Sequence, residues 1–397
     1  MKSLRPAWKS KDVAEAVKAV KGLQDETELV CVAKKAKYRK VCIAAVKKLT
    51  GQSALADVAC NAEDFDVCIA AVKRLSDQKI LVDIIQNDNS NLFVCIEAIN
   101  KLTDQSILVD IAKNDQAEGM FADAVVCKLT DQTLIADIAQ NANNEFSRTA
   151  ALQRLTVQSV IAGIAKNDKS NFVRMQAVEK LTDQFILADI AINDEDWLVR
   201  KEAVIKLLDR NILARIAKSD EDSDVRSAAV EKVTNKCLLA EIAKSDEDSS
   251  VRSAAVKRLT SKRLLAEIAQ NDENSYVRSA AVKKLTNQKL LEAIAKKDND
   301  CKVRIAAVKN MTNQYILTNI GRTDRDLEVC EAAVERLTDQ RFLVVIAKNH
   351  KACNLRCMAV KKLRNKFILA EISETDRSGK VRMTAVKRLA DLKQDEE

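Results

Sequence analysis

Residues 233–259 read VTNKCLLAEIAKSDEDSSVRSAAVKRL, and this stretch decides the fold. Apolar residues recur at helical spacing from Leu238 to Ala243, after the polar residues 234–235, either of which suits a helix N-cap. The polar run at 245–249 breaks that helix and offers caps for a second one beginning near Val251. The stretch therefore predicts two short helices joined by a polar turn.

The same unit recurs along the whole chain. We call the first residue of the phrase Leu-Thr-Asp-Gln, or of its close relatives, the anchor. The anchors are Leu49, Leu75, Leu102, Leu129, Leu155, Leu181, Leu207, Val233, Leu259, Leu285, Met311, Leu337, Leu363 and Leu389, with a weaker forerunner at Leu23. Twelve of the steps between them are equal and two are longer by a single position, so the period is about 26 residues. No linker interrupts the array, so we expect one continuous domain over 23–389, with residues 1–22 and 390–397 as caps.

Composition narrows the class of protein. The 397 residues include one Pro and 6 Gly, too few for the turns of a β-rich fold, and 47% are hydrophobic, too many for a disordered chain. The single His350 and the absence of any CxxC among 11 Cys argue against a zinc site or a disulfide scaffold. We therefore expect an all-helical protein that binds no metal and no cofactor.

Arginine recurs inside the second helix. At 100° per residue, the apolar positions of that helix cover about 200° of its circumference, so neighbours must cover it on several sides. An Arg lies seven residues before most anchors, within the buried arc, where an unpaired guanidinium would be costly. An Asp stands six residues before most of these arginines, as Asp246 does before Arg252. We predict a ladder of satisfied pairs. Its members are Asp168, Arg174, Asp194, Arg200, Asp220, Arg226, Asp246, Arg252, Asp272, Arg278, Asp298, Arg304, Asp376 and Arg382.

This pattern resembles the HEAT-like repeat family, whose fold is an α-solenoid of antiparallel helix pairs with an Asp/Arg ladder in the same places. The resemblance covers residues 23–390. It implies an all-α protein, a right-handed α-solenoid of about 14 stacked antiparallel helix pairs forming a HEAT-like superhelix. The unit is shorter than the roughly 40–47 residues usual for HEAT repeats and lacks a first-helix Pro. The match is to short HEAT-like units, as in bilin-lyase-type and DNA-glycosylase-type relatives.

Four repeats carry Cys in place of the ladder Arg, at Cys42, Cys68, Cys95 and Cys330. A thiol within the buried arc is expected to act as a small apolar substitute, and not as a reactive group.

A basic residue directly precedes nearly every anchor, with Asn310 as the exception. Two interpretations stay open. Such residues complement the dipole at a helix C-terminus, or they form a stripe that tracks a phosphate backbone, which a net charge of +8 would permit. The scarcity of aromatic residues favours the first. The candidate phosphate-contacting residues are Arg154, Lys180, Lys206, Lys232, Arg258 and Lys284. First helices carry acidic residues at one register, so we expect opposite charges on the two helix layers.

Positions six and two before the anchor escape the buried arc and should form an exposed ridge. The first of these varies between repeats, and in the central repeats it is Ser227, Ser253 and Ser279, which we interpret as spacers. Aromatic residues nine or ten before the anchor are either hydrophobic staples or an anchor line for a partner. The candidate partner-binding residues are Phe146, Phe172, Trp197, Met175 and Lys201.

Signals for catalysis are weak. The chain has no Gly-rich phosphate loop, no GxSxG and no HExxH, and its carboxylates recur with the repeat. We expect a non-enzymatic scaffold that binds a protein or peptide partner on the second-helix surface. The alternative is nucleic-acid binding through the basic stripe, including the activity of a HEAT-like DNA glycosylase. The resemblance implies a pocket with Trp and Asp in such an enzyme, and Trp197 with Asp194 is the one place where this chain has a similar pair. No run reaches the roughly 18 apolar residues of a membrane span and none resembles a signal peptide, so we expect no membrane partner and a cytoplasmic location.

Overall fold

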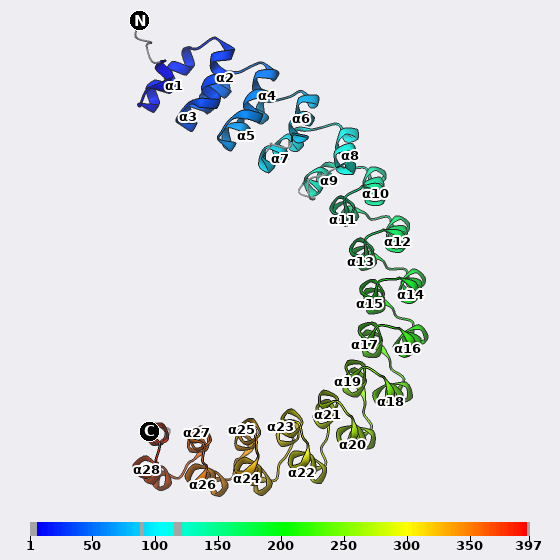
Figure 1. Cartoon of the computed structure of the whole chain (residues 1–397), viewed down its shortest axis with the longest axis vertical. Coiled ribbons are helices and arrows are strands. Elements are labelled where there is room, and N and C mark those ends of the chain that lie inside the picture. The colour runs from blue at the N-terminus through cyan, green and yellow to red at the C-terminus, as the bar shows by residue number, and fades with distance from the viewer. Residues whose placement is uncertain (1–5, 88–90, 115–120, 395–397) are drawn as a thin grey trace. The chain divides into compact units, whose positions relative to one another are not determined.

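The computed structural model describes residues 6–87, 91–114 and 121–394, and every regular element in those ranges is a helix (Figure 1). From α2 (Glu26–Lys35) to α29 (Gly379–Gln394) the helices alternate between the first and second helix of fourteen repeats. Stacked antiparallel helix pairs of this kind make an α-solenoid, which confirms the predicted fold class. The chain divides into two compact units, one ending at Ile190 and the other beginning at Ala191.

Within unit 1 the even-numbered helices form one layer and the odd-numbered helices the other (Figure 1). The first helices of its repeats are α2, α4 (Gln52–Asn61), α6 (Gln78–Ile85), α8 (Gln105–Asn114), α10 (Gln132–Asn141) and α12 (Gln158–Asn167), with α14 (Gln184–Asn193) containing the division between the units. The second helices are α3 (Arg39–Lys48), α5 (Phe65–Arg74), α7 (Leu92–Lys101), α9 (Ala122–Lys128), α11 (Glu145–Arg154) and α13 (Asn171–Lys180).

Unit 2 has the same two layers. Its first helices are α16 (Arg210–Ser219), α18 (Lys236–Ser245), α20 (Lys262–Asn271), α22 (Gln288–Lys297), α24 (Gln314–Thr323), α26 (Gln340–Asn349) and α28 (Lys366–Thr375). Its second helices are α15 (Trp197–Lys206), α17 (Ser223–Lys232), α19 (Ser249–Arg258), α21 (Ser275–Val282), α23 (Cys301–Lys309), α25 (Leu327–Arg336), α27 (Cys353–Lys362) and α29.

The anchor phrase is the turn that joins one repeat to the next. Leu337 is the C-cap of α25 and is fully buried. Two residues later, the side chain of Asp339 accepts a hydrogen bond from the backbone N–H of Arg341 and so caps α26, which begins at Gln340. The four letters of the phrase therefore encode a buried helix end, a linker residue, an N-cap and a helix start.

Small side chains recur at one buried register of the second helices. Ala229, Ala255 and Ala281 occupy one register of α17, α19 and α21, and each is fully buried. Ala333 of α25, at the same register, lies against Gly321 of the first helix α24. Because alanine lets helix backbones approach closely, this register brings the two helices of one repeat together.

The described part of the predicted N-terminal cap is helical. A short 3-10 helix, η1 (Ala7–Lys9), packs on α1 (Val13–Gly22), and α1 packs on α3 in the second-helix layer. Trp8 of η1 is buried. Among the described residues, no helix combines the length and the apolar character needed to cross a membrane.

We predict that Leu337→Ala lowers the free energy of unfolding by about 2–5 kcal/mol, because it leaves a cavity at a fully buried helix end. Urea unfolding followed by circular dichroism at 222 nm measures this. Met383→Ala, at a side chain that is 75% exposed in α29, is the control and should change stability by less than about 0.5 kcal/mol. Equal effects of the two variants would contradict the assignment of the anchor to the core.

Candidate functional site

Most of the ladder arginines are buried, and most join adjacent repeats. In α17, Arg226 donates from Nε and Nη2 to the two carboxylate oxygens of Asp246, at 3.1 and 3.0 Å. Its Nη1 donates to the backbone carbonyl oxygens of Asp220 and Glu221, at 2.9 and 3.2 Å. The hydrogen bonds to Asp246 raise the pKa of the Arg226 guanidinium above its usual value. A two-pronged ion pair and two carbonyl bonds satisfy a charge that would otherwise be costly to bury.

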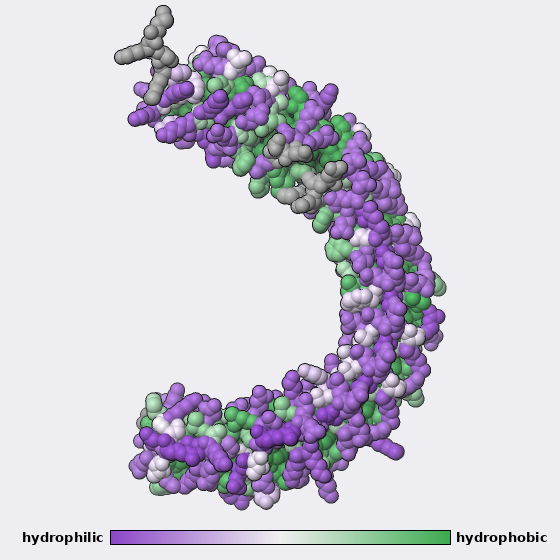
Figure 2. All heavy atoms as spheres, viewed as in Figure 1, coloured by the Kyte–Doolittle hydropathy of each residue, from purple (hydrophilic) through white to green (hydrophobic). Residues whose placement is uncertain are grey.

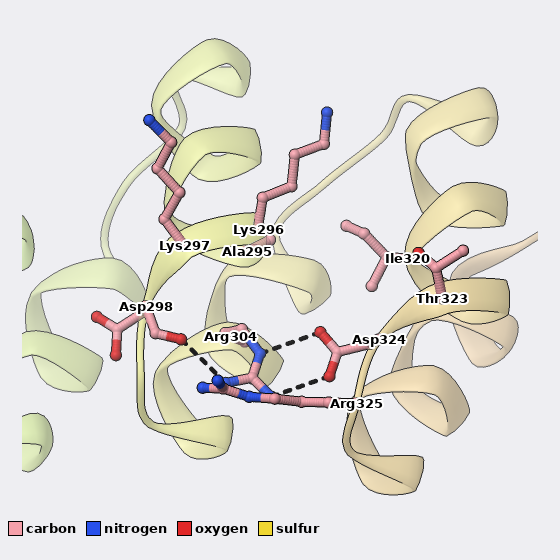
Figure 3. A pocket seen from close by; sticks show the side chains of 9 residues that line it. All are labelled: Ala295, Lys296, Lys297, Asp298, Arg304, Ile320, Thr323, Asp324 and Arg325. Atoms are coloured by element: carbon pink, nitrogen blue, oxygen red, sulfur yellow. Dashed lines mark hydrogen bonds and ion pairs between the residues drawn. The ribbon is translucent and has the colours of Figure 1, made fainter.

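Figure 3 shows the same arrangement around Arg304. Its Nε and Nη2 donate to Asp324 at 3.0 and 2.9 Å, and its Nη1 donates to the carbonyl oxygen of Asp298 at 2.9 Å. The side chains of Lys296 and Lys297 point away from this pair (Figure 3). The guanidinium is thus fully engaged by protein groups.

Each carboxylate comes from the repeat that follows the one carrying the Arg. The pairs seen are Arg148–Asp168, Arg200–Asp220, Arg226–Asp246, Arg252–Asp272, Arg278–Asp298, Arg304–Asp324 and Arg356–Asp376. The expectation that Arg252 pairs with the Asp six residues before it is therefore wrong. Arg252 donates to the backbone carbonyl oxygen of Asp246 but not to its carboxylate, which pairs with Arg226.

The remaining predicted ladder residues make the backbone part of this pattern. Arg174, Arg200 and Arg382 donate from Nη1 to the carbonyl oxygens of Asp168, Asp194 and Asp376. Sequence reasoning missed Asp324, because the residue six positions after it is Cys330 and not an arginine. The available signal was Arg304, which precedes Asp324 by the same interval that separates Arg226 from Asp246.

Several repeats without the Arg also lack the matching carboxylate. Ala16, Cys42, Ala122 and Cys330 occupy the Arg register, and at the Asp register of the next repeat stand Ala36, Ala62, Ala142 and His350. In the repeats of Cys68 and Cys95 that register holds Asp88 and Asp115, which lie outside the described residues. The absence of the Arg is thus accompanied by absence of the Asp for four of these six helices.

The cysteines at the Arg register are buried ladder substitutes. The thiols of Cys42 and Cys68 donate to the carbonyl oxygens of Ala36 and Ala62, each at 3.3 Å. These carbonyls lie where the Nη1 of a ladder Arg would bond. Burial raises the pKa of both thiols, which keeps them protonated.

The basic residues before the anchors bond backbone carbonyls of the preceding repeat. Arg258 donates to the carbonyl oxygens of Glu231 and Val233 at 2.6 and 3.0 Å, at the C-terminus of α17. The residues that bond in this way are Lys48, Arg74, Lys101, Lys128, Arg154, Lys180, Lys232, Arg258, Lys284, Arg336, Lys362 and Arg388. Asn310 makes the same bonds with its amide, to Val282, Lys283 and Leu285.

This capping occupies the candidate phosphate-contacting groups. Arg154, Lys180, Lys232, Arg258 and Lys284 all donate to carbonyl oxygens, and Lys206 lies half-buried at the same register. Desolvation lowers the pKa of Lys180, Lys232 and Lys362, as expected for ammonium groups drawn partly out of water. Of the two interpretations, the geometry favours complementing the helix dipole.

The Gln of the anchor phrase makes another bond between repeats. Gln314 accepts at Oε1 from the backbone N–H groups of Thr338 and Asp339, at 2.7 and 3.1 Å, and donates from Nε2 to the carbonyl oxygen of Arg336 at 3.4 Å. One amide thus fastens the next anchor turn. Sequence reasoning missed this role, and the recurrence of Gln three residues after the anchor was its signal.

The first-helix layer is not the acidic surface that the sequence predicted opposite a basic second-helix layer. Most of the first-helix acids pair with a Lys of the preceding first helix. These pairs are Lys34–Asp57, Lys113–Asp137, Lys166–Asp189, Lys218–Glu241, Lys244–Glu267 and Lys348–Glu371. The acidic register is therefore neutralised within its own layer.

Two of the candidate partner-binding aromatics lie exposed in the second-helix layer of unit 1. Phe146 and Phe172 are 51% and 46% exposed and are each the second residue of their helices, α11 and α13. Phe65 and Phe93 are also exposed near the starts of α5 and α7, where Figure 2 shows hydrophobic residues reaching the surface. A hydrophobic staple joins the residue before the N-cap to the fourth residue of the helix, so these phenylalanines are not in staple positions.

The other candidates differ in environment. Met175 of α13 is half-buried. In unit 2, Trp197 begins α15 and is 36% exposed, and the ammonium of Lys201 lies 5.5 Å from its ring centroid, a cation–π distance. The carboxylate of Asp194 accepts from the backbone N–H of Asp196 at 2.9 Å, so it serves the turn before α15.

The predicted ridge is narrower than expected. Positions two before the anchor are exposed, but those six before it are mostly half-buried, and Ser279 and Cys357 are buried. The neighbouring second helix covers this register, which a wheel drawn for one helix does not include. Over the described ranges, no group of three or more His, Cys, Asp or Glu side chains is arranged to hold a metal ion.

Comparison with known proteins gives only loose likenesses. No protein-family model matches the chain, and no curated protein matches its sequence. Solved structures that resemble it include Escherichia coli YibA, at 17% identity and a TM-score of 0.33, covering 63% of this chain and 98% of that one. Importin beta is 14% identical with a TM-score of 0.33 and coverage of 97% and 60%. Kap95p, from a study of its binding to RanGDP, is 13% identical with a TM-score of 0.34 and coverage of 96% and 59%. The chain spans about three fifths of the length of these last two.

We predict that the ladder couples Arg252 to Asp272 and not to Asp246. A double-mutant cycle of Arg252→Leu with Asp272→Asn should give a coupling energy of about 1–3 kcal/mol in urea unfolding, because each change leaves the other group buried and unpaired. The matched cycle of Arg252→Leu with Asp246→Asn should stay within about 0.5 kcal/mol. Larger coupling in the second cycle would restore pairing within a repeat.

We predict that His350 makes the fold less stable as the pH is lowered. Burial lowers the pKa of this imidazole, whose Nδ1 accepts from the backbone N–H of Ala352 at 3.0 Å near the cationic Arg356. A base with a lower pKa in the folded state binds fewer protons there, so stability is lost as pH falls below the unfolded value of about 6.5. NMR titration of the single His should give a pKa below that of the urea-unfolded chain. Between pH 7 and 5.5, His350→Asn should lose less stability than wild type, and equal losses would contradict this origin.

Proposed function

We propose that this chain is a HEAT-like repeat protein that acts as a non-enzymatic scaffold and binds a protein or peptide partner on its second-helix surface. One observation carries the proposal. The recurring polar groups bond between repeats, whereas large aromatic side chains at the start of several second helices are left exposed to solvent. Aromatic side chains on a rigid helical layer are suited to serve as anchors for a partner.

The exposed aromatics are not required by the fold. Phe146 and Phe172 lie outside the staple positions of their helices, and the N-cap of α11 is already supplied by Asn144, which accepts from the backbone N–H of Phe146 at 2.8 Å. Exposed phenylalanine costs solubility without stabilising the helix start. A partner that covers these rings would supply the missing burial.

Nucleic acid binding has less support. The basic residues that would contact phosphate already bond carbonyl oxygens, and a phosphate would have to replace those bonds. The aromatics are one to a helix and stand at helix starts, which is not the continuous stacking platform of single-strand binders. We therefore do not propose the nucleic-acid or glycosylase alternative.

The proposal predicts that peptides selected from an unbiased displayed library bind through the unit 1 aromatics. The double variant Phe146→Ala/Phe172→Ala should bind such peptides at least about tenfold more weakly, because each ring lost from an anchor site costs about 1–2 kcal/mol. Isothermal titration calorimetry with the purified chain measures this.

The matched control is Phe185→Ala, at a phenylalanine that is 89% exposed on the first-helix α14. It removes a more exposed ring from the other layer and should leave affinity within about twofold. Selected peptides that bind both variants as tightly as wild type, or that are lost only with Phe185→Ala, would overturn the second-helix surface as the binding surface.

A further inference from the structure

Two of the three repeats that the sequence suggested were spacers, together with the repeat after them, border an open hollow of about 450 Å³ between α19, α21 and α23. Its lining includes Ser253 and Ser279, the small residues six positions before their anchors. In several other repeats this register holds isoleucine, as at Ile43, Ile69 and Ile96. Serine in place of isoleucine leaves unfilled space between neighbouring second helices, of a size typical of ligand sites.

Four lysines line the hollow, and no acidic residue does. They are Lys257, Lys283, Lys302 and Lys309, and all four are exposed. We call this hollow, with its four lysines, the lysine groove. Among the described residues, no carboxylate forms an ion pair with the ammonium group of Lys257, Lys283 or Lys309. These lysines stand one residue before the capping position, so the carbonyl bonds that occupy Lys284 and Arg258 do not occupy them.

Apolar surface accompanies the charge. Tyr276 is 66% exposed, and Ile305 and the buried Ala306 also line the groove. The ammonium of Lys302 lies 5.1 Å from the Tyr276 ring centroid and donates to the Tyr276 hydroxyl at 3.3 Å. The ring is thus fixed at the edge of the hollow, beside a cation that a partner carboxylate would also meet.

The groove has defined ends. At the register two before the anchor, the repeat before Lys257 has Glu231, and the repeat after Lys309 has Glu335. Both glutamates are exposed. A run of three lysines between two glutamates limits an anionic partner to the three repeats that contain the hollow.

The spacing of the lysines fits an extended polypeptide. Neighbouring second helices pack about 8–10 Å apart, so Lys257, Lys283 and Lys309 stand at steps of about that length. A polyproline II chain has three residues per turn and rises about 3.1 Å per residue, so every third side chain returns to one face after about 9 Å. Acidic side chains three residues apart would therefore meet successive lysines.

We propose that the lysine groove binds an acidic peptide in extended conformation, with carboxylates at every third residue and an apolar side chain in the hollow. The inference deepens the proposed function and rests on it in that the partner is a polypeptide on the second-helix layer. A nucleic acid would find one aromatic ring in three repeats, which is poorly suited to stacking successive bases, whereas the hollow accepts an aliphatic side chain.

The test uses the full chain and a fluorescein-labelled twelve-residue peptide of four Glu-Pro-Leu units, titrated by fluorescence anisotropy at low salt. Wild type should bind it at least tenfold more tightly than the corresponding Lys-Pro-Leu peptide. Lys257→Glu/Lys283→Glu should weaken binding at least tenfold. Lys361→Glu/Lys387→Glu makes the same change of charge at the same register of other repeats and should alter affinity less than twofold.

A second variant separates the hollow from the charge. Ser253→Ile fills the space with the side chain that other repeats carry at this register, so the fold tolerates it, and it removes no lysine. It should weaken peptide binding at least fivefold. A twelve-nucleotide single-stranded DNA that binds more tightly than the peptide, and that responds to the lysine variants but not to Ser253→Ile, would overturn the proposal in favour of nucleic acid.

The remaining outcomes are equally decisive. Equal loss with the two lysine pairs, full retention by Ser253→Ile, or no binding of the peptide to wild type would each overturn the lysine groove. Phe146→Ala/Phe172→Ala lies in unit 1 and should leave binding of this peptide unchanged. The two surfaces are therefore tested separately, and failure of the groove leaves the proposed function standing.

Discussion

The buried arginine is the constraint on which the array depends. A guanidinium within the stack needs a carboxylate, and it takes that carboxylate from the next repeat while its Nη1 bonds carbonyl groups of its own repeat. In each of the seven ion pairs, the repeat that carries the Arg therefore depends on the next repeat for its counter-charge. Replacing one partner would leave the other buried and unpaired, so each Arg of the ladder requires a matching carboxylate in the repeat that follows. This requirement ties the stacking of neighbouring repeats to the identity of two residues.

Most of the remaining polar groups serve the same end. The basic residue before the anchor bonds the end of the preceding second helix, and the Gln after it bonds the next turn. The first-helix lysines and acids pair across repeats. A net charge of +8 thus overstates the free positive charge on the surface. The residues that stay available for a partner are those next to the residues that make these bonds. Lys257, which directly precedes the capping Arg258, is an example.

Much of this fold could be predicted from the sequence, because the near-constant period and the anchor phrase set the helix ends. The sequence also contained the information that each Arg pairs with the Asp of the next repeat. Asp324 follows Arg304 at the interval at which His350 follows Cys330, so a carboxylate accompanies the arginine of the preceding repeat. The role of the basic residues before the anchors could not be predicted from the sequence. A lysine at a helix end fits both a complement to the helix dipole and a contact to phosphate. Only the position of the preceding helix shows which carbonyls it meets. The burial of Ser279 likewise depends on a neighbour that a single helical wheel omits.

In an array of near-identical units, information lies in departures from the common residue at a fixed register. Replacing isoleucine by serine at Ser253 and Ser279 changes neither helix nor ladder, since both positions lie between the groups that hold the repeats together. It does change the surface, because volume removed from adjacent helices adds up to one hollow. The small residues at this register therefore shape the surface and do more than separate the repeats. The same repeats carry Lys257 and Lys283, which form no ion pair with a carboxylate of the described residues, and the flanking repeats carry glutamate at this register. The hollow and an unpaired positive charge therefore coincide on one face. Uniform stacking alone would not require that coincidence, and recognition of an acidic partner would.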